Sequence, residues 1–124
     1  LISSIQVLNE FSGWETWANF PHERIKLLDL LHAYNNENIL IISGDIHKAE
    51  ISQLNYKDQI FRDITSSGLD ARTYPKSINN HRIGKTLEEK NYGILEIQDN
   101  GKLTVRATIY NEKGKAKLTT KLGE

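Results

Sequence analysis

The feature that most constrains this chain is an apolar run, Ile39-Leu40-Ile41-Ile42, that leads directly into Ser43-Gly44-Asp45-Ile46-His47. The run does not alternate with polar residues. It therefore predicts a strand covered on both faces, as in the parallel part of an α/β sheet. Open α/β sheets bind ligands at the carboxyl ends of such strands, which makes Asp45 and His47 candidate site residues.

The remaining patterns predict a single layered α/β domain over residues 1–124. Pro21 suits the first turn of a helix, an apolar stripe through Leu27, Leu28, Leu31 and Tyr34 suits packing on a sheet, and Asn35-Asn36 ends the helix. Residues 49–59 show only a weak pattern. We expect strands at 1–8, 60–65, 92–98, 103–110 and 116–121, a loop at 9–20, a hairpin turn at Asp99-Asn100-Gly101, and a long functional loop at 69–91.

Composition excludes some classes of function. Sixteen basic residues balance sixteen acidic ones, so no broad charge attracts nucleic acid, and no apolar run is long enough for a membrane span. The absence of cysteine excludes disulfides and thiolate metal sites but leaves the compartment open. Because the chain begins with Leu1 and contains no methionine, we expect it to be a piece of a longer protein.

The Asp-x-His pattern has two interpretations. If the chain stays extended, Asp45 and His47 project to the same side, Ile46 turns back into the core, and Gly44 leaves room for the backbone to approach an ion. A carboxylate oxygen and an imidazole nitrogen suit zinc, iron or manganese, although a hydrolytic site needs at least three protein ligands. In the other interpretation Asp45 caps a turn and His47 is a hydrogen-bonded bystander.

Large side chains of the first loop are candidates for either structure or substrate contact. We expect Trp14 and Trp17 to anchor the loop, whereas Trp17 and Phe20 could also line a cleft. Arg24 is expected to tie the loop to the sheet by hydrogen bonds rather than to contact phosphate.

The long loop carries Asn80, His81 and Arg82, which could reach a phosphate group. Their alternative role is that of solvated loop residues.

Five ordered segments together resemble the C-terminal half of alkaline phosphatase D (PhoD-like) enzymes, over residues 1 to about 98. They are Ser3-Ser4-Ile5-Gln6, Trp17-Ala18-Asn19-Phe20-Pro21-His22-Glu23-Arg24, Ser43-Gly44-Asp45-Ile46-His47, Ile64-Thr65-Ser66-Ser67-Gly68-Leu69 and Asn91-Tyr92-Gly93. The resemblance implies part of a calcineurin-like metallophosphoesterase fold, with layered sheets flanked by helices. It also implies a secreted or periplasmic protein.

The resemblance further implies metal-dependent hydrolysis of phosphate monoesters and diesters at a centre of iron and calcium, with Asp45 and His47 as metal ligands. The family's N-terminal half, which carries the other ligands and the catalytic histidine, has no counterpart in these residues. We therefore expect the missing half to be a partner of this chain, and the chain alone to be inactive. The alternative function is that of a non-catalytic α/β module that binds a partner or small ligand.

Overall fold

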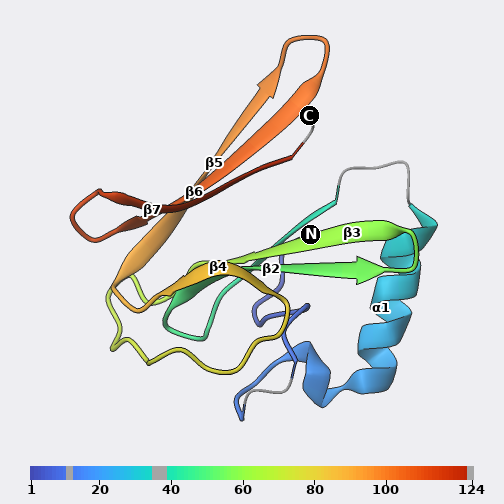
Figure 1. The fold of residues 1–124 in the computed structure, drawn as a ribbon, viewed down its shortest axis with the longest axis horizontal. Helices are drawn as coiled ribbons and strands as arrows, with labels where there is room; N and C mark the ends of the chain where they lie inside the picture. The colour runs from blue at the N-terminus through green and yellow to red at the C-terminus, as the bar shows by residue number, and fades with distance from the viewer. Residues whose placement is uncertain (11–12, 35–38, 123–124) are drawn as a thin grey trace.

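The computed structural model describes residues 1–10, 13–34 and 39–122, and within them the chain is a mixed α/β protein with two sheets (Figure 1). In chain order the elements are η1 (Trp17–Asn19), α1 (Pro21–Ala33), β1 (Leu40–Ser43), β2 (Ala49–Tyr56), β3 (Gln59–Thr65), β4 (Arg82–Leu87), β5 (Asn91–Asp99), β6 (Leu103–Asn111) and β7 (Ala116–Leu122). The described helices are not long and apolar enough to cross a membrane.

The elements form three layers, with the four-stranded sheet in the middle. This sheet A has the strand order β1-β3-β2-β4, and sheet B has the order β5-β6-β7. One face of sheet A packs on α1 and the other on part of sheet B (Figure 1). The α1 side buries Val7, Leu8, Leu28, Ile41 and Phe61, and the sheet B side buries Ala49, Ile51, Ile64, Leu87, Ala107 and Ile109.

The helix follows its sequence signals. It begins at Pro21, whose missing N–H is not needed in the first turn, and buries Leu28 against the sheet. Leu27 and Leu31 pack against the same cluster, whereas Tyr34 at the end of the predicted stripe is exposed. The predicted end at Asn35-Asn36 lies outside the described residues.

Strand β1 confirms the parallel pairing, since it lies parallel to β3 with Leu40 beside Arg62 and Ser43 beside Thr65. Burial on both faces is only partly right. Ile41 is fully buried toward α1, but Leu40 and Ile42 on the other face are partly exposed. The expected first strand is reduced to a single parallel bridge between Ile2 and Ile42.

Two strands escaped prediction from the sequence. Strand β2 lies between β3 and β4 in sheet A, yet its buried positions include Glu50 and Ser52, which break any apolar pattern. Strand β4 lies inside the segment expected to be a loop, at the edge of the sheet. Strand β2 forms a tight hairpin with β3, with Tyr56 opposite Gln59, but its buried polar side chains hid it. Strand β4 was missed because its partner β2 lies far back in the sequence and its side chains are satisfied only in the tertiary structure.

Sheet B agrees with its predicted pattern. Strands β5 and β6 form a hairpin in which Asp99 pairs with Leu103 and Gly101 takes a φ of 82°, as a tight turn requires. Of the expected inward face of β6, Ala107 and Ile109 are buried, whereas Leu103 is exposed because the hairpin projects beyond sheet A (Figure 1).

A buried irregular segment, residues 6–9, runs between α1 and sheet A. Its polar backbone groups need partners because no water reaches them. The Asp63 carboxylate accepts from the backbone N–H groups of Val7 and Leu8, at 2.8 and 3.2 Å. Arg24 donates to the carbonyl oxygens of the same two residues, both at 2.8 Å. It therefore makes structural hydrogen bonds as expected, but these join α1 to the irregular segment rather than the loop to the sheet.

Glu50 is the centre of a second buried network. Its carboxylate accepts from Gln6 at 2.9 Å, Asn79 at 2.8 Å and Arg82 at 2.7 Å. Burial alone would raise the pKa of Glu50, but these hydrogen bonds and the Arg82 charge outweigh it and hold the pKa below its ordinary value. Among the described residues no cation pairs with Asp63, and burial raises its pKa.

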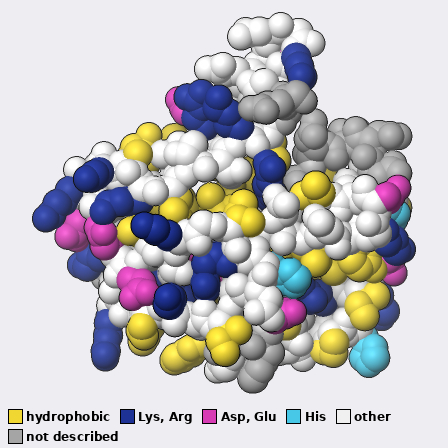
Figure 2. Space-filling model, viewed as in Figure 1, with side chains coloured by type: hydrophobic (Ala, Val, Ile, Leu, Met, Phe, Trp, Pro, Cys, Tyr) yellow, Lys and Arg dark blue, Asp and Glu magenta, His cyan; other side chains and the backbone are white. Residues whose placement is uncertain are grey.

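On the face shown in Figure 2, Lys and Arg side chains gather mainly at the left with Asp and Glu side chains among them, and hydrophobic side chains are exposed between. The face shown is therefore mixed in character, in agreement with the zero net charge of the chain. Exposed large hydrophobic residues of sheet B include Ile94, Leu95, Ile97 and Leu103.

We predict that Glu50→Gln lowers the free energy of unfolding by about 3 kcal/mol, because Arg82 would be left without its buried counter-ion. Urea denaturation measures this loss. Since the folded-state pKa of Glu50 lies below 4.5, the stabilisation is present above pH 4.5 and is lost as the pH falls through that lower value. The difference between the wild type and the variant should shrink accordingly in acid.

Glu96→Gln is the control, because the half-exposed Glu96 lies 3.9 Å from Arg106 and should contribute less than about 1 kcal/mol. Equal losses in the two variants would contradict the assignment of Glu50 as a structural centre.

Candidate functional site

The candidate site lies directly after β1, around a cavity of about 540 Å³ that is lined by Asp45, His47 and Lys48 among others. The loop from Gly44 to Lys48 forms one wall, and parts of the first and long loops form the others. The lining residues are Gly13, Trp14, Glu15, Asn19, Asp45, Ile46, His47, Lys48, Tyr74 and Ser77.

The backbone turns at the Asp-x-His pattern instead of remaining extended. Asp45 and His47 have φ values of 71° and 51°, in the left-handed region that residues with a Cβ seldom adopt. The expectation of an extended segment with Ile46 in the core was therefore wrong, since Ile46 is partly exposed and lines the cavity. Asp45 and His47 nevertheless reach the same cavity.

His47 is held in a defined orientation by the long loop. Its Nδ1 lies 2.9 Å from the carbonyl oxygen of Arg72, and its own carbonyl oxygen accepts from the Tyr74 N–H at 3.2 Å. Because a carbonyl oxygen only accepts, Nδ1 must carry a proton, and Nε2 of the neutral ring keeps a free lone pair. This is the arrangement in which a histidine binds a metal ion through Nε2.

Asp45 is exposed at the mouth of the same loop. Among residues 1–10, 13–34 and 39–122, its carboxylate takes part in no hydrogen bond or ion pair. The capping role proposed as an alternative therefore finds no partner in the described part of the chain.

The glycine that fits closely against this site is Gly68 rather than Gly44. A Cβ on Gly44 would make only ordinary contacts, the nearest 3.7 Å from the Ser4 carbonyl oxygen. Gly68 has a φ of 86°, and a Cβ there would lie 3.2 Å from the Cα of His47. Gly68 thus allows the chain after β3 to pass directly beside His47.

Lys48 contributes a cation to the cavity wall, a residue that the sequence did not single out. Its Nζ donates to the Pro75 carbonyl oxygen and to Ser77 Oγ, both at 2.9 Å, and the side chain is almost fully buried. Burial lowers the pKa of Lys48, partly opposed by the negative charge of Glu50.

The structure does not bring Asn80, His81 and Arg82 into this cavity. Arg82 donates to the buried Glu50, and Asn80 and His81 both lie against Glu10, with Asn80 Nδ2 2.6 Å from Glu10 Oε2. Their contacts are structural.

The described residues contain no group of three or more His, Asp or Glu side chains that could hold a metal ion. His22 lies exposed at the start of α1, and His32 lies 3.4 Å from Asp58. Asp45 and His47 therefore remain two candidate ligands, without a third beside them in the described part of the chain.

The two tryptophans have roles that sequence reasoning did not separate. Trp17 is an anchor, because it packs on the core and its Nε1 donates to Ser3 Oγ at 3.1 Å. Trp14 is 58% exposed and lines the cavity, and Phe20 is exposed away from it.

Tyr74 also lines the cavity but was missed as an individual residue, although the length of its loop indicated a functional segment.

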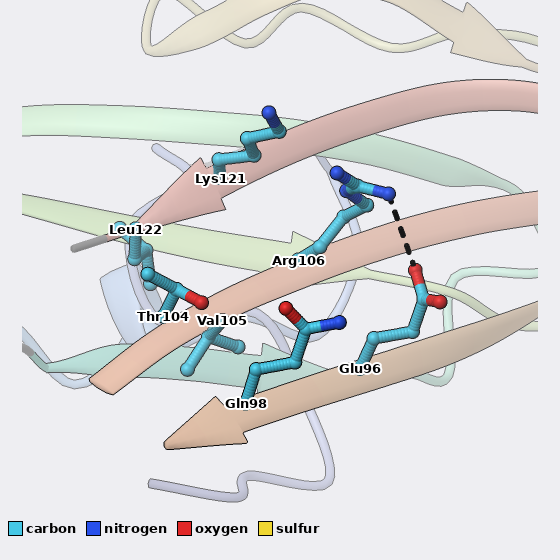
Figure 3. A pocket seen from close by; sticks show the side chains of 7 residues that line it. All are labelled: Glu96, Gln98, Thr104, Val105, Arg106, Lys121 and Leu122. Atoms are coloured by element: carbon cyan, nitrogen blue, oxygen red, sulfur yellow. Dashed lines mark ion pairs between the residues drawn. The ribbon is translucent and has the colours of Figure 1, made fainter. Parts of the chain in front are cut away.

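Another hollow, of about 250 Å³, lies across the three strands of sheet B (Figure 3). Its polar contacts centre on the exposed ion pair between Arg106 and Glu96, and no histidine lines it. It offers fewer reactive groups than the cavity at His47.

Comparisons of the chain with models of protein families, with curated proteins and with solved structures gave no match.

We predict that Gly68→Ala displaces His47, because the added methyl group would press on its backbone. Gly84→Ala is the matched control: Gly84 also has a positive φ, 74°, but a Cβ there meets nothing within 4 Å. Both variants should lose roughly 1–2 kcal/mol of stability from the backbone conformation. Only Gly68→Ala should shift the imidazole signals of His47 in NMR spectra, and an unchanged His47 would contradict the close fit.

Proposed function

We propose that this chain is the C-terminal part of a PhoD-like metallophosphoesterase that hydrolyses phosphate monoesters and diesters in its complete form. Asp45 and His47 would hold a metal ion at the end of β1. The ordered sequence motifs suggest the family, and the geometry around His47 supports the role of this pair.

The observation that carries the proposal is the hydrogen bond from His47 Nδ1 to the carbonyl oxygen of Arg72. A bystander histidine on a surface loop needs no fixed ring orientation. A metal ligand does, and a backbone carbonyl on the far nitrogen is a common way to obtain it. The carboxylate of Asp45, which has no hydrogen-bond or ion-pair partner among the described residues, lines the same cavity and would supply an oxygen ligand.

The types of ligand atom at this site suit the proposed metals. An imidazole nitrogen with a carboxylate oxygen suits iron, and the resemblance favours iron together with calcium. When bound, metal ions in such a site polarise phosphoryl oxygens and make a water molecule more acidic. Lys48 lines the same cavity, where its ammonium could contact an oxygen of the phosphoryl group.

The proposal requires further ligands from the rest of the complete protein. An apolar cleft between β1 and the projecting hairpin favours such an additional part, because large exposed apolar surfaces normally have a partner. Its lining residues are Leu40, Ile42, Leu95, Ile97, Leu103, Val105 and Leu122.

We predict that Asp45→Ala and His47→Ala in the complete protein reduce metal content and phosphodiesterase activity together. Metal analysis after desalting and turnover of bis(4-nitrophenyl) phosphate measure the two effects. His22→Ala is the control, since His22 is an exposed histidine at the start of α1 and does not line the cavity. Unchanged metal content in both site variants would reject the proposal and favour a non-catalytic binding module.

We predict that the 124-residue chain alone, supplied with iron and calcium, shows no sustained phosphodiester turnover, because two ligands are too few for a hydrolytic site. Sustained turnover that disappears in His47→Ala would contradict the proposed division of the site between two parts of the protein.

A further inference from the structure

Trp14 occupies an unusual position for a large aromatic residue. It is 58% exposed, yet it lies in the wall of the cavity rather than on an open convex surface. An anchoring tryptophan packs its ring on the core, as the partly buried Trp17 of η1 does. Exposed aromatic rings in concave sites instead provide contact area for ligands.

A row of three rings connects Trp14 with the proposed metal ligand. The ring centroids of His47 and Tyr74 are 5.4 Å apart with an interplanar angle of 26°, a stacked arrangement. Those of Tyr74 and Trp14 are 5.5 Å apart with an angle of 37°. A group attached to a phosphate beside His47 would therefore find Trp14 one ring further along the cavity.

The cavity is also larger than a phosphate group requires. Its volume of about 540 Å³ lies within the usual range for small-molecule sites, roughly 300–1,000 Å³. The phosphate end would contain His47 and Lys48, which leaves the Trp14 end for an organic group.

We propose that this cavity takes phosphate esters whose organic group is a planar aromatic ring system, such as a nucleoside or an aryl ester, stacked on Trp14. Tyr74 supports Trp14 from the side of His47. This substrate class rests on the proposed phosphoesterase function.

A quaternary ammonium group is the other common ligand of aromatic clusters. The Tyr74 ring already has a cation partner, because the Arg72 guanidinium lies 5.8 Å from its centre. A bound cation would therefore have to use the Trp14 ring, which makes choline the competing probe for the same surface.

The test uses the ¹⁵N-labelled 124-residue chain, whose two tryptophans give separate indole N–H signals in NMR spectra. Adenosine, which has no phosphate, is the first probe. Its binding should shift the Trp14 indole signal and leave that of Trp17 unchanged. Because adenosine needs no metal, this result does not depend on the proposed metal site.

The affinity for adenosine is then measured by titration, from the shifts of the backbone amide signals of residues 45–48. Trp14→Ala should weaken adenosine binding roughly 5- to 150-fold, the loss expected for one stacked base. Tyr34→Ala is the matched control, since Tyr34 is similarly exposed at the end of α1 but does not line the cavity.

Equal effects of the two substitutions, or no shift of Trp14 with adenosine, would overturn the proposal. So would a larger Trp14 shift with choline than with adenosine. Failure of the phosphoesterase proposal alone would look different: Asp45→Ala and His47→Ala would leave metal content unchanged in the complete protein, while Trp14 would still respond to adenosine.

Discussion

The rest of this fold depends on the hydrogen bonds that the buried Asp63 carboxylate accepts. One oxygen accepts the backbone N–H groups of Val7 and Leu8, and the other accepts Ser43 Oγ at 2.6 Å. A single buried side chain of β3 therefore fixes both the irregular segment under α1 and the last residue of β1. Asp63 and Arg24 together satisfy the amides and carbonyls of Val7 and Leu8, which would otherwise cost several kcal/mol to bury.

This anchoring determines where the candidate site can form. Ser43 is fixed to the sheet, so the left-handed turn at Asp45 and His47 begins from a rigid point. Such backbone conformations cost about 1–3 kcal/mol each and persist where surrounding contacts impose them, often at functional sites. Here Gly68 and the carbonyl of Arg72 hold the turn from two sides. The contacts from Gly68 and Arg72 thus account both for the strained backbone at His47 and for the fixed orientation of its imidazole ring.

The two proposals share one cavity but use different physical properties of it. The metal proposal depends on lone pairs, those of His47 Nε2 and the Asp45 carboxylate. The substrate proposal depends on the free surface of Trp14 and on the volume between it and His47. Tyr74 connects the two parts of the cavity, because its ring packs on those of His47 and Trp14. Its backbone N–H also donates to the His47 carbonyl oxygen.

The sequence by itself determined the elements whose signals are local. Pro21 and the leucine stripe predicted α1, the apolar run predicted β1, and Asp99-Asn100-Gly101 predicted the hairpin. Only the tertiary structure decided the rest. Strand β2 carries a buried glutamate that is tolerated because Gln6, Asn79 and Arg82, all distant in sequence, converge on it. The turn at His47 and the exposure of Trp14 likewise depend on loops that meet only in the folded chain, so no local pattern could predict them.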